Sequence, residues 1–147
     1  MSMTGKCLCG AVRYTIASDK TEAGACHCEM CRAWTGGVFL SVTVAKEELT
    51  LVGGEHLTVY KSSDWAERGF CSRCGSSLFY RITAPGPMEG EFHLCAGTLE
   101  DWGGATLKTE IYIDRKPAGY AFAGETRKMT KAEIEAMFAP PPDGGKA

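Results

Sequence analysis

The fold is decided by a short stretch near the N-terminus, Cys7-Leu8-Cys9-Gly10-Ala11-Val12-Arg13-Tyr14. It places two cysteines on a tight turn, follows them with a glycine and then runs into a segment of alternating apolar side chains. The same order returns in Cys71-Ser72-Arg73-Cys74-Gly75-Ser76-Ser77-Leu78-Phe79-Tyr80. A turn that presents two sulfurs to a metal often needs a positive φ at the next residue, which glycine adopts without strain. The repeated order therefore indicates two half-sites that share one ion.

Seven of the eight cysteines fall into three clusters, and the third cluster lies between the two half-sites. Structural zinc takes four protein ligands in a closed tetrahedron, whereas catalytic zinc usually keeps three and an open position. Seven thiolates therefore divide as four plus three, and we expect two zinc ions, one structural and one catalytic. The structural site is assigned to Cys7, Cys9, Cys71 and Cys74, and the catalytic site to Cys26, Cys28 and Cys31.

Length and composition describe an ordinary folded chain. The 147 residues are 44% hydrophobic and 23% charged, with a formal charge of -2. The length predicts one zinc-binding β domain over residues 1–139, and the near-neutral charge gives no reason to expect nucleic acid as a partner. No apolar run is long enough for a membrane span, and the first residues lack a secretory pattern, so we expect a cytoplasmic protein. A reducing cytosol favours metal-bound thiolates over the alternative of disulfides.

Secondary structure is predicted to be mainly β. Alternating apolar residues or short apolar runs predict strands at 11–16, 38–44, 49–52, 57–60, 77–82, 91–96 and 110–113. One short C-terminal helix is expected after Thr130, because Thr130-Lys131-Ala132-Glu133 has the spacing of a capping box and Ile134, Met137 and Phe138 form an apolar stripe. The Pro/Gly-rich residues 140–147 are expected to form a disordered tail.

The charge of the three-cysteine cluster limits its chemistry. Zn²⁺ with three thiolates is formally -1, which makes it a weaker Lewis acid than zinc held by three neutral histidines. Such a site suits a fourth sulfur better than a hydroxide, because metal binding deprotonates a thiol and leaves it nucleophilic. The sequence therefore favours a thiol as the substrate.

Three further residues could reach an ion. His27 lies between two predicted ligands and is either a ligand or, as we favour, a residue that supports them or contacts substrate. His93 and Cys95 share a face of a predicted strand and could also approach a metal. The favoured alternative is that Cys95 is a small buried hydrophobe and His93 an ordinary strand histidine.

Three motifs follow one another along the chain: 5–14, then Cys26-His27-Cys28-Glu29-Met30-Cys31-Arg32 with Thr35-Gly36, then 70–78. Together with Ala96-Gly97-Thr98-Leu99-Glu100-Asp101 they resemble the glutathione-dependent formaldehyde-activating enzyme family, which also includes centromere protein V. The likeness covers roughly residues 5–122.

The resemblance implies a zinc-stabilised, mainly β fold of the Mss-four-like type, built from curled antiparallel sheets. It implies the division of ligands given above, with Cys26, Cys28 and Cys31 as the catalytic set. It also implies a carbon–sulfur lyase in which glutathione and formaldehyde condense to S-hydroxymethylglutathione, so that the partners are a small-molecule thiol and an aldehyde. Nothing in the pattern indicates an oligomeric state.

Residues beside the catalytic cluster are candidates for contacts with such a substrate. Arg32 could bind a carboxylate of glutathione, and Trp34 could form an apolar wall or pack in the core. Arg13 and Arg68 are further candidates, although a solvated surface arginine is the favoured interpretation of both. Glu29 could relay a proton or be an exposed loop carboxylate.

Two other functions fit the same sequence. One is a non-catalytic zinc-stabilised module that binds another protein, with all seven thiolates serving stability. The other is a thiol redox protein in which Cys95 is the reactive group. Metal stoichiometry and exchange distinguish the first from an enzyme, and the reactivity of Cys95 tests the second.

Overall fold

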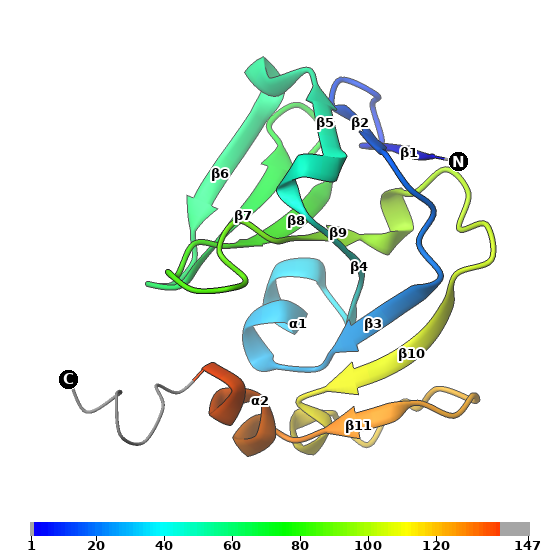
Figure 1. Cartoon of the computed structure of the whole chain (residues 1–147), viewed down its shortest axis with the longest axis vertical. Helices are drawn as coiled ribbons and strands as arrows, with labels where there is room; N and C mark the ends of the chain where they lie inside the picture. Colours follow the sequence, from blue (N-terminus) through cyan, green and yellow to red (C-terminus); the bar gives the residue numbers. More distant parts are fainter. Residues whose placement is uncertain (1, 139–147) are drawn as a thin grey trace. The chain divides into compact units, whose positions relative to one another are not determined.

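The computed structural model describes residues 2–138 and contains two compact units (Figure 1). Each unit is built from two stretches of chain. The four-cysteine unit takes residues 2–23 and 40–106, and the three-cysteine unit takes residues 24–39 and 107–138. The single domain over residues 1–139 stays a prediction.

The four-cysteine unit contains a small antiparallel sheet of three strands. Its order is β1 (Met3–Lys6), β2 (Arg13–Ile16) and β5 (Leu49–Val52). Along β2 the burial alternates strictly, with Tyr14 and Ile16 buried. This alternation confirms the period-two pattern that predicted the strand, because one face of the sheet packs on the core while the other meets water.

Five more strands of this unit pair in antiparallel fashion in the order β4-β9-β8-β7-β6. Their bounds are Phe39–Val44 for β4, whose first residue counts with the other unit, Phe92–Cys95 for β9, Ser77–Ile82 for β8, Ala66–Cys71 for β7 and Leu57–Lys61 for β6. Val42, Leu78 and Leu94 are at most 1% exposed and form the centre of the core here. The bounds of β5 and β8 agree with the sequence prediction, whereas β1 and β7 were not predicted.

The three-cysteine unit has three strands in the order β11-β10-β3. They are Arg127–Met129, Thr106–Ile111 and Glu22–Cys26, although the first two residues of β3 and the first of β10 count with the other unit. β10 and β11 run parallel, which departs from an all-antiparallel pattern. Neither β3 nor β11 was predicted.

Helices also lie in the three-cysteine unit: α1 (Glu29–Thr35) and α2 (Lys131–Phe138). α2 confirms the predicted C-terminal helix and its capping box. Thr130 N donates to Glu133 Oε1 at 2.8 Å, and Glu133 N donates to Thr130 Oγ1 at 3.2 Å. Of the predicted apolar stripe only Ile134 is buried, whereas Met137 and Phe138 are 57% and 53% exposed.

The predicted fold class, mainly β with curled antiparallel sheets and a C-terminal helix, is confirmed, and α1 is an additional element. Short 3-10 turns at Lys46–Glu48, Gly54–His56, Ala96–Thr98 and Ile113–Arg115 complete the list. Between residues 2 and 138, none of the helices is long and apolar enough to cross a membrane. The predicted tail at 140–147 lies outside the described residues.

Candidate metal centres

Four cysteine sulfurs of the four-cysteine unit gather in one place. The Sγ atoms of Cys7 and Cys9 are 3.7 Å apart, and those of Cys9 and Cys71 are 3.8 Å apart. With Cys74 included, all four sulfurs lie within 4.8 Å of one another. A tetrahedron with Zn–S bonds near 2.3 Å places its sulfurs about 3.8 Å apart, so the group has the dimensions of a structural zinc site.

Both cysteine turns have the geometry that the repeated motif predicts. Gly10 and Gly75 have φ values of 80° and 79°. Each donates its N–H back to the first cysteine of its turn, at 3.0 Å to Cys7 O and 2.8 Å to Cys71 O. The positive φ at each glycine turns the backbone so that two sulfurs point the same way and the chain enters a strand.

Backbone N–H groups and one hydroxyl support these sulfurs. Cys7 Sγ accepts from Val12 N at 3.3 Å, and Cys71 Sγ accepts from Arg73 N at 3.3 Å. The hydroxyl of Ser76 and nearby backbone N–H groups lower the pKa of Cys74 to about 5. This residue is therefore a thiolate at neutral pH.

The pKa of Cys9 is shifted in the opposite direction. A backbone hydrogen bond at Ala11 lowers the pKa of Cys9, but burial and the neighbouring sulfurs outweigh it and raise that pKa to about 11. A cluster of this kind holds several thiolates together only when a cation balances them.

The three-cysteine cluster is built around the start of α1. Cys26 ends β3, Cys28 is the N-cap of α1, and Cys31 lies in its first turn; their sulfurs are within 4.8 Å of one another. Cys28 Sγ accepts from Cys31 N at 3.3 Å, so the sulfur takes the place of the usual capping oxygen. Among the described residues no fourth ligand atom joins this group, so a tetrahedral ion here would have three protein ligands.

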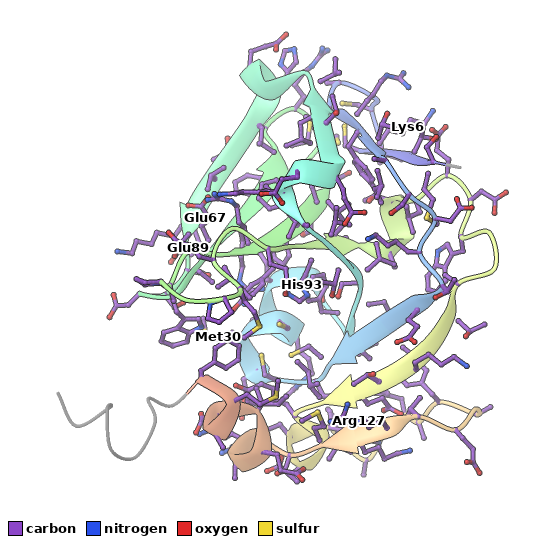
Figure 2. The ribbon with its side chains drawn as sticks, viewed as in Figure 1. Lys6, Met30, Glu67, Glu89, His93 and Arg127 are labelled. Atoms are coloured by element: carbon purple, nitrogen blue, oxygen red, sulfur yellow. The ribbon has the colours of Figure 1, made fainter. Side chains whose placement is uncertain are left out.

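Charge is shared unevenly among the three sulfurs. Hydrogen bonds from the Cys26 and Cys31 thiols lower the pKa of Cys28 to about 2, and the same interactions raise the pKa of Cys26. Cys28 is also the only partly exposed member of the three, since Cys26 and Cys31 are buried. Met30, on α1 between two of the ligands (Figure 2), is 41% exposed. The cluster thus meets solvent on the side of Cys28.

His27 is not placed to be a ligand. Its side chain is fully buried, and both ring nitrogens are occupied, Nε2 at 2.8 Å from Glu110 Oε1 and Nδ1 at 2.9 Å from Tyr120 Oη. His93, labelled in Figure 2, contacts Glu91 Oε1 at 3.1 Å through Nε2. Neither His93 nor Cys95 belongs to the two sulfur groups of the described residues, and Cys95 is buried, as favoured from the sequence.

Three residues that were predicted beside the substrate have contacts within this unit. Arg32 Nε donates to the carbonyl of His27 at 2.9 Å, so the guanidinium holds the ligand turn. Trp34 is half-buried and meets Phe39 edge-on, with ring centroids 5.9 Å apart. Glu29 pairs with Arg115 at 3.1 Å on the surface.

The other candidate arginines behave differently from each other. Arg13 is exposed, as favoured from the sequence. Arg68 is only 3% exposed, so the surface interpretation is wrong for it: its guanidinium stacks on the Tyr80 ring, 4.9 Å from the centroid, and Nε donates to Ser62 Oγ. Aromatic stacking and a hydroxyl partner allow this cation to be buried.

Two groups near the three-cysteine cluster were missed in the sequence. Glu110 carries no motif and lies on β10 beside His27. Tyr112 is the one non-glycine residue between 2 and 138 with a positive φ, 57°. Burial and then the charge of Cys28 and Cys26 raise the pKa of Tyr112 to about 12. The sulfurs therefore act on this tyrosine electrostatically, a relation that the sequence does not show.

Comparison with known proteins gives a consistent picture. Residues 2–115 match the model of a family described as glutathione-dependent formaldehyde-activating enzyme. This range contains all seven clustered cysteines. A relative from Schizosaccharomyces pombe, named an uncharacterized lyase, is 29% identical over 130 residues, which are 88% of this chain and 92% of the relative.

Two other relatives carry the family's name provisionally. A Halomonas elongata protein, so named, is 36% identical over 87 residues, which cover 54% of this chain and 55% of the relative. A Podospora anserina protein with the same name is 32% identical over 104 residues, covering 68% of this chain and 49% of the relative. The chain thus spans about half the length of these two proteins.

Proposed function

The chain belongs to the glutathione-dependent formaldehyde-activating enzyme family, and we propose that it is a zinc-dependent carbon–sulfur lyase acting on glutathione, or a similar thiol, and formaldehyde. The observation that carries this proposal is the cluster of Cys26, Cys28 and Cys31, in which three sulfurs gather without a fourth ligand atom from the described residues. A closed four-cysteine group elsewhere in the chain supplies the contrast. The first group is proposed to be catalytic and the second structural.

The proposed reaction joins the two substrates without a redox change. The thiol loses its proton, its sulfur forms a bond to the carbonyl carbon, and the carbonyl oxygen takes up a proton to give an S-hydroxymethyl product; cleavage is the reverse. Zinc, when bound, would favour the thiolate form of the incoming thiol. The donor set fits that ion, because three thiolates suit a soft cation and the three sulfurs lie within 4.8 Å of one another.

The chain's own residues would shape the site. Buried Cys26 and Cys31 keep water from one side, while the half-buried Cys28 marks the side open to substrate. Arg32 is proposed to approach a substrate carboxylate in addition to holding the His27 carbonyl, and Trp34 to border the substrate. The clustered free thiols also support a reducing compartment, and we propose a cytoplasmic location.

The test measures the rate at which zinc-loaded protein forms S-hydroxymethylglutathione above the uncatalysed background. NMR exchange spectroscopy monitors this rate. Cys28→Ser should lower the catalysed rate by about 100-fold or more, since even partners outside the ligand set are worth 10–100-fold. Cys95→Ser is the matched control, because Cys95 is a buried cysteine outside both groups. Equal rates for Cys28→Ser and the unsubstituted protein would refute the proposal.

Metal exchange separates this function from a non-catalytic module. An enzyme of the proposed kind should hold two zinc ions, of which the one at the three-cysteine cluster exchanges with added isotope faster than the one at the four-cysteine group. Two equally inert ions would favour the module, in which both groups serve stability alone.

A further inference from the structure

The strongest unexplained feature of the three-cysteine unit is a buried polar network around His27. The imidazole is fully buried and Glu110 is 2% exposed. A histidine and a carboxylate are expensive to bury unless their polar atoms find partners. This pair is next to the metal ligands in sequence, yet neither member is a ligand.

Every polar atom of the pair has a partner in this unit. Glu110 Oε1 is 2.8 Å from His27 Nε2, and Glu110 Oε2 accepts from Thr126 Oγ1 at 2.5 Å. Lys128 Nζ lies 3.8 Å from the same carboxylate. On the other side of the ring, Nδ1 is 2.9 Å from Tyr120 Oη. The imidazole is therefore held from two directions.

The backbone of His27 is fixed as well. Its N–H donates to Ile111 O at 3.1 Å, which joins it to β10 one residue after Glu110. Its carbonyl accepts from Arg32 Nε at 2.9 Å, which joins it to α1. Since Cys26 and Cys28 flank this residue, the same bonds limit the backbone angles that set where both sulfurs lie.

We propose that His27 and Glu110, closed by Thr126 and Tyr120, form a clamp that positions Cys26 and Cys28 and sets how slowly the three-cysteine cluster releases its metal. Metal leaves a thiolate cluster one ligand at a time, so a sulfur that is kept close after it dissociates rebinds before the next one leaves. The sulfurs therefore bind the metal, and the clamp lowers the rate at which it dissociates. His27 and Glu110 are thus positioning residues.

The four-cysteine group serves as an internal control for the clamp. The four-cysteine group lies in the other unit, and its supporting bonds come from glycine turns, backbone N–H groups and Ser76. A change in the clamp should therefore alter one metal site and leave the other as it was. The proposal does not depend on the reaction proposed above, because metal release is measured without substrate.

The experiment follows zinc transfer to a chromogenic chelator from protein loaded with two equivalents. Two phases are expected, and Cys28→Ser identifies the one that belongs to the three-cysteine cluster. Glu110→Gln keeps the shape of the side chain and removes its charge, and it should speed that phase by about 10–100-fold. Tyr120→Phe removes one hydroxyl and should give a smaller increase. The phase of the four-cysteine group should stay within about twofold of the unsubstituted rate.

Controls distinguish a clamp from general damage. His93→Gln is the matched control for His27→Gln, because His93 also pairs with a carboxylate, that of Glu91, but lies on β9 of the other unit. It should leave both phases of zinc release unchanged. His27→Gln carries an amide N–H at about the place of Nε2 and should release metal more slowly than His27→Ala. In Co²⁺-loaded protein, Glu110→Gln should change only the sulfur-to-cobalt absorption of the three-cysteine cluster.

Two results would overturn the proposal. One is a release rate from the three-cysteine cluster that stays within about twofold of the unsubstituted protein in both Glu110→Gln and Tyr120→Phe. The other is an equal acceleration of both phases, which would show that the network supports the fold in general and not this metal site.

Discussion

The four-cysteine group allows a test of how much a bound metal stabilises its unit, through the substitution Cys9→Ser. Cys9 is the exposed member of the group, whereas Cys7 and Cys71 are buried. Replacing it removes one sulfur at 3.7 Å from Cys7 Sγ and 3.8 Å from Cys71 Sγ without opening a cavity in the core. The change therefore acts on the metal and hardly at all on packing.

The expected size follows from the ligand count. A structural zinc site is worth about 10–16 kcal/mol in apparent binding free energy, so one of four sulfurs accounts for about 2.5–4 kcal/mol. This is a large part of the 5–15 kcal/mol that stabilises a typical domain. At about 2–4 °C for each kcal/mol in a chain of this length, Cys9→Ser should lower the midpoint of thermal unfolding by about 5–16 °C.

The assay is thermal unfolding by circular dichroism of zinc-loaded protein, repeated with excess chelator. The difference between Cys9→Ser and the unsubstituted protein should be large with metal and close to zero without it. Leu8→Ser is the matched control, since Leu8 lies in the same turn, is 86% exposed and carries no ligand. A difference that persists unchanged in chelator, or that Leu8→Ser reproduces, would refute the reasoning.

Two further substitutions test contacts outside the metal sites. A Cβ on Gly5 would overlap the buried Tyr14 ring, whose hydroxyl bonds Thr98, so Gly5→Ala should cost about 1–3 kcal/mol by urea unfolding, and a cost near zero would contradict the packing described. Hydrogen bonds from Ser18 and then Lys20 hold the pKa of Glu48 below its usual value. The stability that comes from ionised Glu48 is present above the usual pKa and is lost as pH falls through the folded pKa. The unsubstituted protein should therefore have a higher thermal midpoint than Glu48→Gln at neutral pH, and this difference should shrink below about pH 4.5. An advantage that grows on acidification would contradict the assignment.

The metal clusters could be predicted from the sequence because their geometry is local. Each half-site is a turn of a few residues, and the glycine that follows it at Gly10 or Gly75 reports a positive φ that the structure confirms. The only long-range step was to join the two turns, and their repeated order supplied it. Strands with strict alternation, such as β2, were predictable for the same reason.

The elements that were missed lack the usual sequence signals for a helix or a strand. α1 has seven residues and begins with a sulfur cap from Cys28 instead of a Ser, Thr, Asp or Asn, so the usual signal for a helix start is absent. β7 contains the buried Arg68, although a charged residue is expected to face solvent. Its guanidinium stacks on Tyr80 of the neighbouring strand β8, which the sequence does not show. In the first case the capping atom is of an unusual type, and in the second a contact with a neighbouring strand changes where the charged residue can lie.

Glu110 shows why the support of a metal site is harder to predict than its ligands. A glutamate within a strand is expected to face water, yet this one is buried because His27, 83 residues away, and Thr126, 16 residues away, both bond its carboxylate. Ligand types are few, and their spacing follows the ion, so they form recognisable motifs. Any donor can satisfy a buried carboxylate from any direction that the fold provides, so its partners have no fixed spacing. The bonds that hold Cys26 and Cys28 in place therefore become visible only when the chain is folded, although the cysteines themselves can be recognised in the sequence.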